Sequence, residues 1–173
     1  MRMPILLPML IISICSTLSS NAQSKSSQTT TVGPWEIATS YKADKFDACV
    51  MNRSAAGFGM SFMRAQDGLL LLLESSKWKL DRGKAYTVRL VAGSQSVEAK
   101  AFAETRGVTV ALADRPFKSF EQQTVLDVRG EGATLQVPLD GSAVAFERLE
   151  ACFEKNSRER AETNSFVAPD RKP

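Results

Sequence analysis

Short runs in which apolar and polar residues alternate, each ended by a turn signal, fill the chain from Trp35 to about Pro138. In one of them Tyr86, Val88 and Leu90 occupy every second position, so a strand there would turn one apolar face toward a core. We expect strands at 35–40, 46–51, 57–63, 68–74, 78–80, 86–91, 96–102, 108–112, 124–128 and 133–137. This regular spacing predicts a mainly β fold, an antiparallel β-sandwich or a barrel-like sheet.

Two turn signals indicate how neighbouring runs pair. Asp67-Gly68 separates the run at 57–63 from the run at 68–74, and this dipeptide is typical of tight hairpins. Gly93 lies in a similar turn, after which the next run pairs back on its predecessor. The pairing should therefore be antiparallel between these neighbours.

One segment near the end has helical periodicity instead. Ser142 is a good N-cap, because its hydroxyl can accept a hydrogen bond from an unpaired backbone N–H of the first turn. Phe146, Leu149, Cys152 and Phe153 then fall on one face of a helix. We expect one C-terminal α-helix packed on the sheet.

The first residues have the pattern of an export signal. A positive start at Arg2 precedes an apolar run over 4–18, and the small residues Ser20 and Ala22 occupy the −3 and −1 positions of a cleavage site. The apolar run is too short for a membrane-spanning helix. We expect residues 1–22 to be removed as a secretory signal peptide, which predicts a periplasmic or secreted protein.

The cysteines predict one bridge in the mature protein. Cys15 lies within the expected signal peptide, which leaves Cys49 and Cys152. An even pair in an exported protein favours a disulfide, and closing so long a loop is worth about 4–5 kcal/mol in the chain-entropy model. Two free thiols, or a bridge between two chains, are the alternatives.

The composition divides the chain into four segments. They are the signal peptide at 1–22, a flexible Ser/Gln/Thr-rich lead-in at 23–33, one β-rich globular domain at 34–155 and a charged disordered tail at 156–173. No apolar run after the signal is long enough to span a bilayer. The net charge of +3 over the whole chain gives no argument for nucleic acid. The oligomeric state stays open.

The residue inventory excludes several catalytic systems. The chain has no histidine, so Ser-His-Asp and Cys-His catalysis and histidine-ligated metals are ruled out. We expect no metal, no cofactor and no enzymatic activity. One enzymatic alternative remains, a carboxylate-dependent hydrolase built on Asp114, Asp127 or Asp140, although aspartates near strand ends are ordinarily turn and cap residues.

Two sets of side chains are candidates for a binding surface. Glu147, Glu150 and Glu154 form an acidic stripe on the helix, on the face opposite the core, which could bind a basic partner or a cation. Such a stripe is more commonly a solvated face. Trp35 and Trp78 would mark a binding surface if exposed, although their place in the alternating runs favours the core.

The order of several motifs resembles a known family. They are Trp35 near the mature start, Cys49 in the second run, Trp78-Lys79-Leu80 followed by Gly83 and Tyr86, a closing Val-Pro-Leu-Asp-Gly-Ser at 137–142, an Ala-Phe-Glu-Arg-Leu helix and Cys152. Over about residues 34–155 the chain resembles the invasion-associated locus B-like small periplasmic proteins of alphaproteobacteria. The resemblance implies a periplasmic or envelope-associated β-sandwich domain with no known catalytic residues.

These observations favour an exported, non-catalytic binding module whose partner is an envelope or secreted protein. We expect its role to be in host association or envelope integrity. The alternative is a periplasmic enzyme inhibitor or the carboxylate-dependent hydrolase. A carboxylate pair facing across a cleft would favour the hydrolase, and a projecting ordered loop would favour the inhibitor. A flat apolar patch with an open sheet edge would favour the binding module.

Overall fold

The computed structural model describes residues 29–55, 57–112 and 122–162. The strands in these ranges are β1 (Thr29–Val32), β2 (Trp35–Lys42), β3 (Lys45–Ala55), β4 (Phe58–Ala65), β5 (Gly68–Glu74), β6 (Ala85–Ala92), β7 (Gln95–Glu104), β8 (Gly107–Leu112), β9 (Val125–Arg129) and β10 (Thr134–Pro138). They are followed by the helix α2 (Ser142–Glu162). The expected signal peptide, Asp114 and the end of the tail lie outside the described residues.

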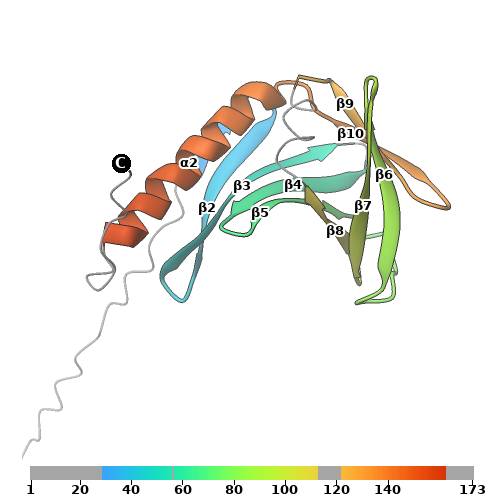
Figure 1. Cartoon of the computed structure of the whole chain (residues 1–173), viewed down its shortest axis with the longest axis horizontal. Coiled ribbons are helices and arrows are strands. Elements are labelled where there is room, and N and C mark those ends of the chain that lie inside the picture. The colour runs from blue at the N-terminus through green and yellow to red at the C-terminus, as the bar shows by residue number, and fades with distance from the viewer. Residues whose placement is uncertain (1–28, 56, 113–121, 163–173) are drawn as a thin grey trace, which may run out of the picture.

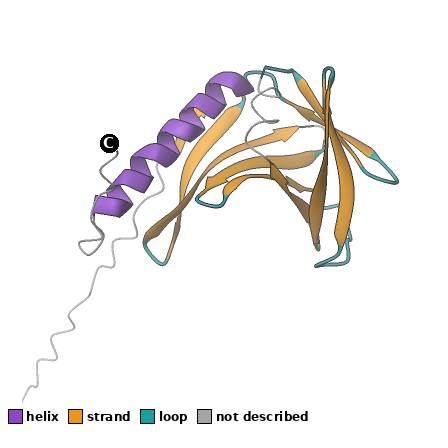
Figure 2. Cartoon of the chain, viewed as in Figure 1, coloured by secondary structure: helices purple, strands orange, loops and turns teal. Residues whose placement is uncertain are grey.

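The ten strands form one antiparallel sheet in the order β1-β2-β3-β4-β5-β8-β7-β6-β9-β10. The sheet is bent, so that β6 and β7 run at a steep angle to β3 and β4 (Figure 1). The helix α2 lies along β2 and packs on β2, β3 and β4 (Figures 1 and 2). The prediction of a mainly β fold with one C-terminal helix packed on it is confirmed.

Three local details differ from the expectations. β1 begins at Thr29, inside the segment expected to be a flexible lead-in, and α2 continues to Glu162, past the point where a disordered tail was expected. The run at 78–80 is not a strand, because the backbone N–H of Trp78 donates to the carbonyl of Ser75 in a turn. This turn begins the connection between β5 and β6, which are not neighbours in the sheet.

The face of the sheet that α2 covers is called the inner face, and it carries the core. One row of directly opposed residues crosses six strands on this face, and all of them are buried: Ile37, Met51, Phe62, Leu71, Val110 and Ala101. Phe62 lies at the centre, with its ring centroid 5.9 Å from that of Trp35 and 4.9 Å from that of Phe146 on the helix. The alternation in the sequence therefore places a continuous apolar layer on the inner face, and α2 covers the part of it on β2, β3 and β4.

A disulfide joins the helix to this layer. Cys49 of β3 is bonded to Cys152 of α2, which confirms the disulfide predicted from the number of cysteines in the mature protein. Beside it, Arg64 lies directly opposite Cys49 in the sheet, forms an ion pair with Glu150 at 3.2 Å and lies over the ring of Phe153. A covalent bond and an ion pair thus hold the same turns of α2 on β3 and β4.

Candidate functional site

Trp35 is a structural residue and contributes no surface. Its side chain is 0% exposed, and its indole Nε1 donates to the backbone carbonyl of Asp140 at 3.0 Å. The hydrogen bond joins the start of β2 to the turn before α2. The candidate role of Trp35 in a binding surface is therefore wrong, because its ring forms part of the core.

Trp78 lies in the connection between β5 and β6. Its side chain is half-buried and packs against the core. The two tryptophans therefore do not form a shared exposed patch.

The acidic stripe of α2 is partly neutralised by neighbouring cations. Glu150 is half-buried and reaches Arg64 of β4, so it borders the sheet and does not lie opposite the core as expected. Glu154 pairs with Arg158 one turn later at 3.4 Å. Glu147 is exposed. Among the described residues no group of three histidines, cysteines or carboxylates could hold a metal ion.

Two of the three candidate aspartates lie in the described part of the chain, and each is bound by an arginine. Asp127 accepts from Arg129 at 2.8 Å and from Gln136 at 3.4 Å, and the Arg129 hydrogen bond lowers the pKa of its carboxyl. Asp140 accepts from Arg53 at 2.7 Å, which lowers its pKa in the same way. A glycosidase acid needs a raised pKa. Neither aspartate is therefore suited to act as the proton donor of a hydrolase.

The sheet face opposite α2, called the outer face, carries several apolar side chains on β3, β4, β5 and β7. In one row across β3, β4 and β5, Val50 opposes Met63, which opposes Leu70. In the next row Leu72 opposes Thr109, which opposes Phe102. We call Val50, Met63, Leu70, Leu72 and Phe102 the outer strip.

The outer strip is accessible to water in part or in large part. Phe102 is 53% exposed, and the other four side chains are half-buried and not packed on the core. The solvated face of an antiparallel sheet ordinarily carries polar residues. Apolar side chains at these positions therefore depart from the usual pattern of a solvated sheet face.

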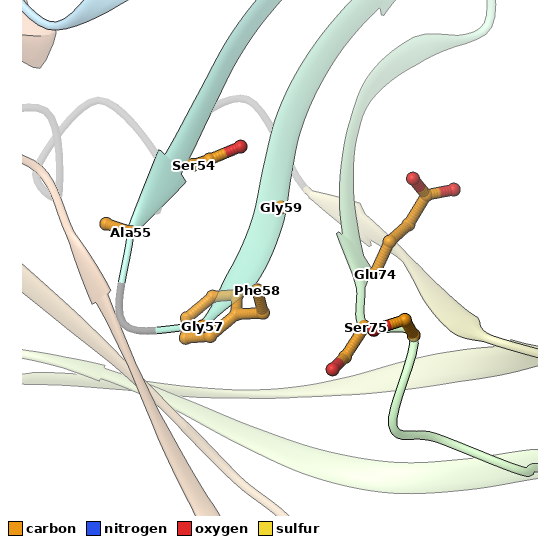
Figure 3. Close-up of a pocket in the computed structure, with 8 residues that line it drawn as sticks. Ser54, Ala55, Gly57, Phe58, Gly59, Glu74 and Ser75 are labelled. Atoms are coloured by element: carbon orange, nitrogen blue, oxygen red, sulfur yellow. The ribbon is translucent and has the colours of Figure 1, made fainter.

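A shallow cleft lies beside the outer strip, where β3 and β5 end and β4 begins (Figure 3). It has a volume of about 430 Å³ and is lined mainly by small residues, together with Phe58 and Glu74. Ser54 opposes Gly59 and Gly59 opposes Glu74, so all three share the outer face. Figure 3 shows the side chains of Ser54 and Glu74 directed to the same side. We call this the Glu74 cleft.

Sequence reasoning did not find the Glu74 cleft or the outer strip. The run at 68–74 predicted a strand, but it gave no sign that Leu70 and Leu72 face outward. The spacing of Gly57 and Gly59 was a usable signal, because an isolated glycine in a strand often marks a place where another group approaches the backbone closely.

Among the described residues, no helix combines the length and the apolar character needed to cross a bilayer. Comparison with protein-family models, with curated proteins and with solved structures finds no match for this chain.

Proposed function

We propose that the chain is an exported, non-catalytic protein that binds another protein of the envelope or the exterior through its outer strip. The observation that carries the proposal is the outer strip, five apolar side chains in two adjacent rows of the sheet face turned away from α2, with Phe102 53% exposed. A partner that buries this surface would remove apolar area from water, which stabilises the complex by about 25 cal/mol for each Å² buried.

An open sheet edge supports the same proposal. In the described part of the chain β1 pairs with β2 alone, which leaves the backbone groups along its other edge available. Thr29–Val32 has neither proline nor charge to block the approach of another strand. An extended partner segment can therefore add to the sheet at this edge.

The export that the proposal requires is supported by the leader pattern at 1–22 and by the disulfide, because stable disulfides are typical of oxidising compartments. The resemblance to the invasion-associated locus B-like proteins leads to the same compartment. On this basis we propose that the protein resides in the periplasm or outside the cell. We propose that it acts in host association or envelope integrity.

Site-specific photocrosslinking tests the proposed function. A benzophenone amino acid replaces Phe102 on the outer strip or, as a matched control, Val144 on α2, which is also 53% exposed. In the cells that produce the protein, we expect irradiation to give one discrete adduct from position 102 and none from position 144.

A second substitution makes the test specific to the strip. Leu72→Lys places a charge in the outer strip, in the row of Phe102 and separated from it by Thr109. We expect the adduct from position 102 to disappear while the melting temperature changes little. Equal adducts from both positions, or an adduct that survives Leu72→Lys, would overturn the assignment of the outer strip.

A further inference from the structure

We propose that the Glu74 cleft binds a lysine or arginine side chain of the partner, next to an apolar residue that contacts the outer strip. This inference rests on the proposed function and specifies the chemistry of the segment that is bound.

The first argument is the space around the carboxylate. Glu74 opposes Gly59 on one side and Gly107 on the other, so neither neighbouring strand places a side chain beside it. A Cβ atom built on Gly59 would meet only the backbone oxygen of Glu74, at 3.9 Å. A ligand can therefore approach the carboxylate from the side of Gly59.

The second argument is charge. Among the described residues, Glu74 is the only ionisable one that lines the cleft, and no described arginine or lysine forms an ion pair with it. Two other outer-face carboxylates are paired, Glu104 with Arg82 at 2.9 Å and Asp127 with Arg129. An unneutralised carboxylate favours a cation over an anion.

The third argument is the polarity of the walls. The hydroxyls of Ser54 and Ser76 add hydrogen-bond acceptors for a group that carries several N–H donors, which an ammonium or a guanidinium does. The ring of Phe58 lies on the inner face, where it packs against the core, so it takes no part in this contact.

The fourth argument is continuity with the outer strip. Leu72 precedes Glu74 by two positions and therefore faces the same side of β5. A partner segment with a basic residue in the cleft would place an apolar neighbour over Leu72. The recognised chemistry is thus a basic residue beside an apolar one.

The test uses a peptide probe and NMR. The oxidised, ¹⁵N-labelled protein is titrated at low salt with acetyl-Leu-Lys-Leu-amide and, as the uncharged match, with acetyl-Leu-norleucine-Leu-amide. We expect saturable shifts of the amides of Gly57, Gly59 and Ser76 with the lysine peptide, weaker binding at high salt, and no saturable shift with the norleucine peptide.

Three variants locate the effect. We expect Glu74→Gln to weaken binding by up to about fivefold, which is the range of one exposed charge pair. Gly59→Val should abolish binding by filling the cleft while the melting temperature stays the same or rises, because valine is favoured in strands. Glu36→Gln, another exposed outer-face carboxylate, should bind as the unmodified chain does.

The outcomes separate this inference from the proposed function. Equal binding of both peptides, no binding of the lysine peptide, or unchanged binding by Glu74→Gln would overturn the cleft assignment, even if the crosslink from position 102 persists. Lysine-specific binding without any crosslink from position 102 would support the cleft and overturn the role of the outer strip.

Discussion

The guanidinium of Arg53 lies 2.7 Å from the carboxylate of Asp140, at the turn that precedes α2. The same guanidinium lies over the ring of Trp35, whose Nε1 donates to the backbone carbonyl of Asp140. Three segments that are distant in the sequence therefore meet at one point: the start of β2, the end of β3 and the start of the helix.

The ion pair between Arg53 and Asp140 predicts a pH-dependent contribution to stability. The hydrogen bond from Arg53 holds the pKa of Asp140 below its ordinary value. A carboxylate with a lowered folded-state pKa stabilises the fold fully above its unfolded pKa, and this stabilisation is lost as the pH falls through the folded pKa. We expect Asp140→Asn to lower the melting temperature at pH 7, by an amount that shrinks below about pH 4.

Melting curves between pH 2.5 and 7 measure this difference in melting temperature, with Glu131→Gln as the control. A difference that grows on acidification would contradict it.

The disulfide predicts a loss of stability on removal. The bridge between Cys49 and Cys152 spans a sequence separation of 103 residues, so its loss enlarges the conformational freedom of the unfolded chain. We expect Cys152→Ser to destabilise the protein by up to about 4–5 kcal/mol in denaturant unfolding. Alkylation of the unreduced, denatured protein should label neither Cys49 nor Cys152. Two labelled thiols, or an unchanged unfolding midpoint, would show that the bridge does not form in solution.

The sequence predicted the parts of the fold that depend on local pattern. The strand β5 has the bounds expected for it, and the apolar face of α2 carries Phe146 and Leu149 into the core as its periodicity required. β1 was missed because three threonines and a valine lack apolar alternation, so its order comes from pairing with β2. The apolar pattern of a short segment does not show which other strand it will pair with.

The candidate site was less predictable because it depends on which residues meet across strands. Alternation shows that Leu70 and Leu72 share one face of β5. It does not show that Val50 and Met63 of the neighbouring strands lie in one row with Leu70. Likewise, the exposure of Glu74 between two glycines results from the register of three neighbouring strands. Trp35 lies in the core, the placement that its alternating run favoured, and the surface role named for it on the condition of exposure does not apply.

The hairpin between β2 and β3 offers a stabilising substitution. Lys42 opposes Lys45, and both residues of the turn between them have positive φ, 49° for Ala43 and 60° for Asp44. This backbone suits a tight hairpin but costs an alanine about 1–2 kcal/mol, whereas asparagine and glycine adopt it more readily. We expect Ala43→Asn to raise the free energy of unfolding by about 1 kcal/mol. Ala43→Val should lower it, since branching at Cβ worsens the strain. Denaturant unfolding of both variants checks the prediction, and a loss of stability in Ala43→Asn would contradict the turn geometry.

The two glycines beside Glu74 should respond in opposite ways to the same substitution. A Cβ atom on Gly107 would lie 2.9 Å from the backbone oxygen of Leu73 and 3.1 Å from Cγ of Glu74, and the backbone oxygen cannot move without disturbing β5. We expect Gly107→Ala to destabilise the protein by about 1–3 kcal/mol. On Gly59 the corresponding Cβ meets its nearest atom at an ordinary 3.9 Å, so Gly59→Ala should leave stability unchanged or raise it, because alanine reduces the freedom of the unfolded chain. Thermal unfolding of the two variants side by side decides the point. Equal effects at both positions would show that the close approach between β5 and β8 at Gly107 is not present in solution.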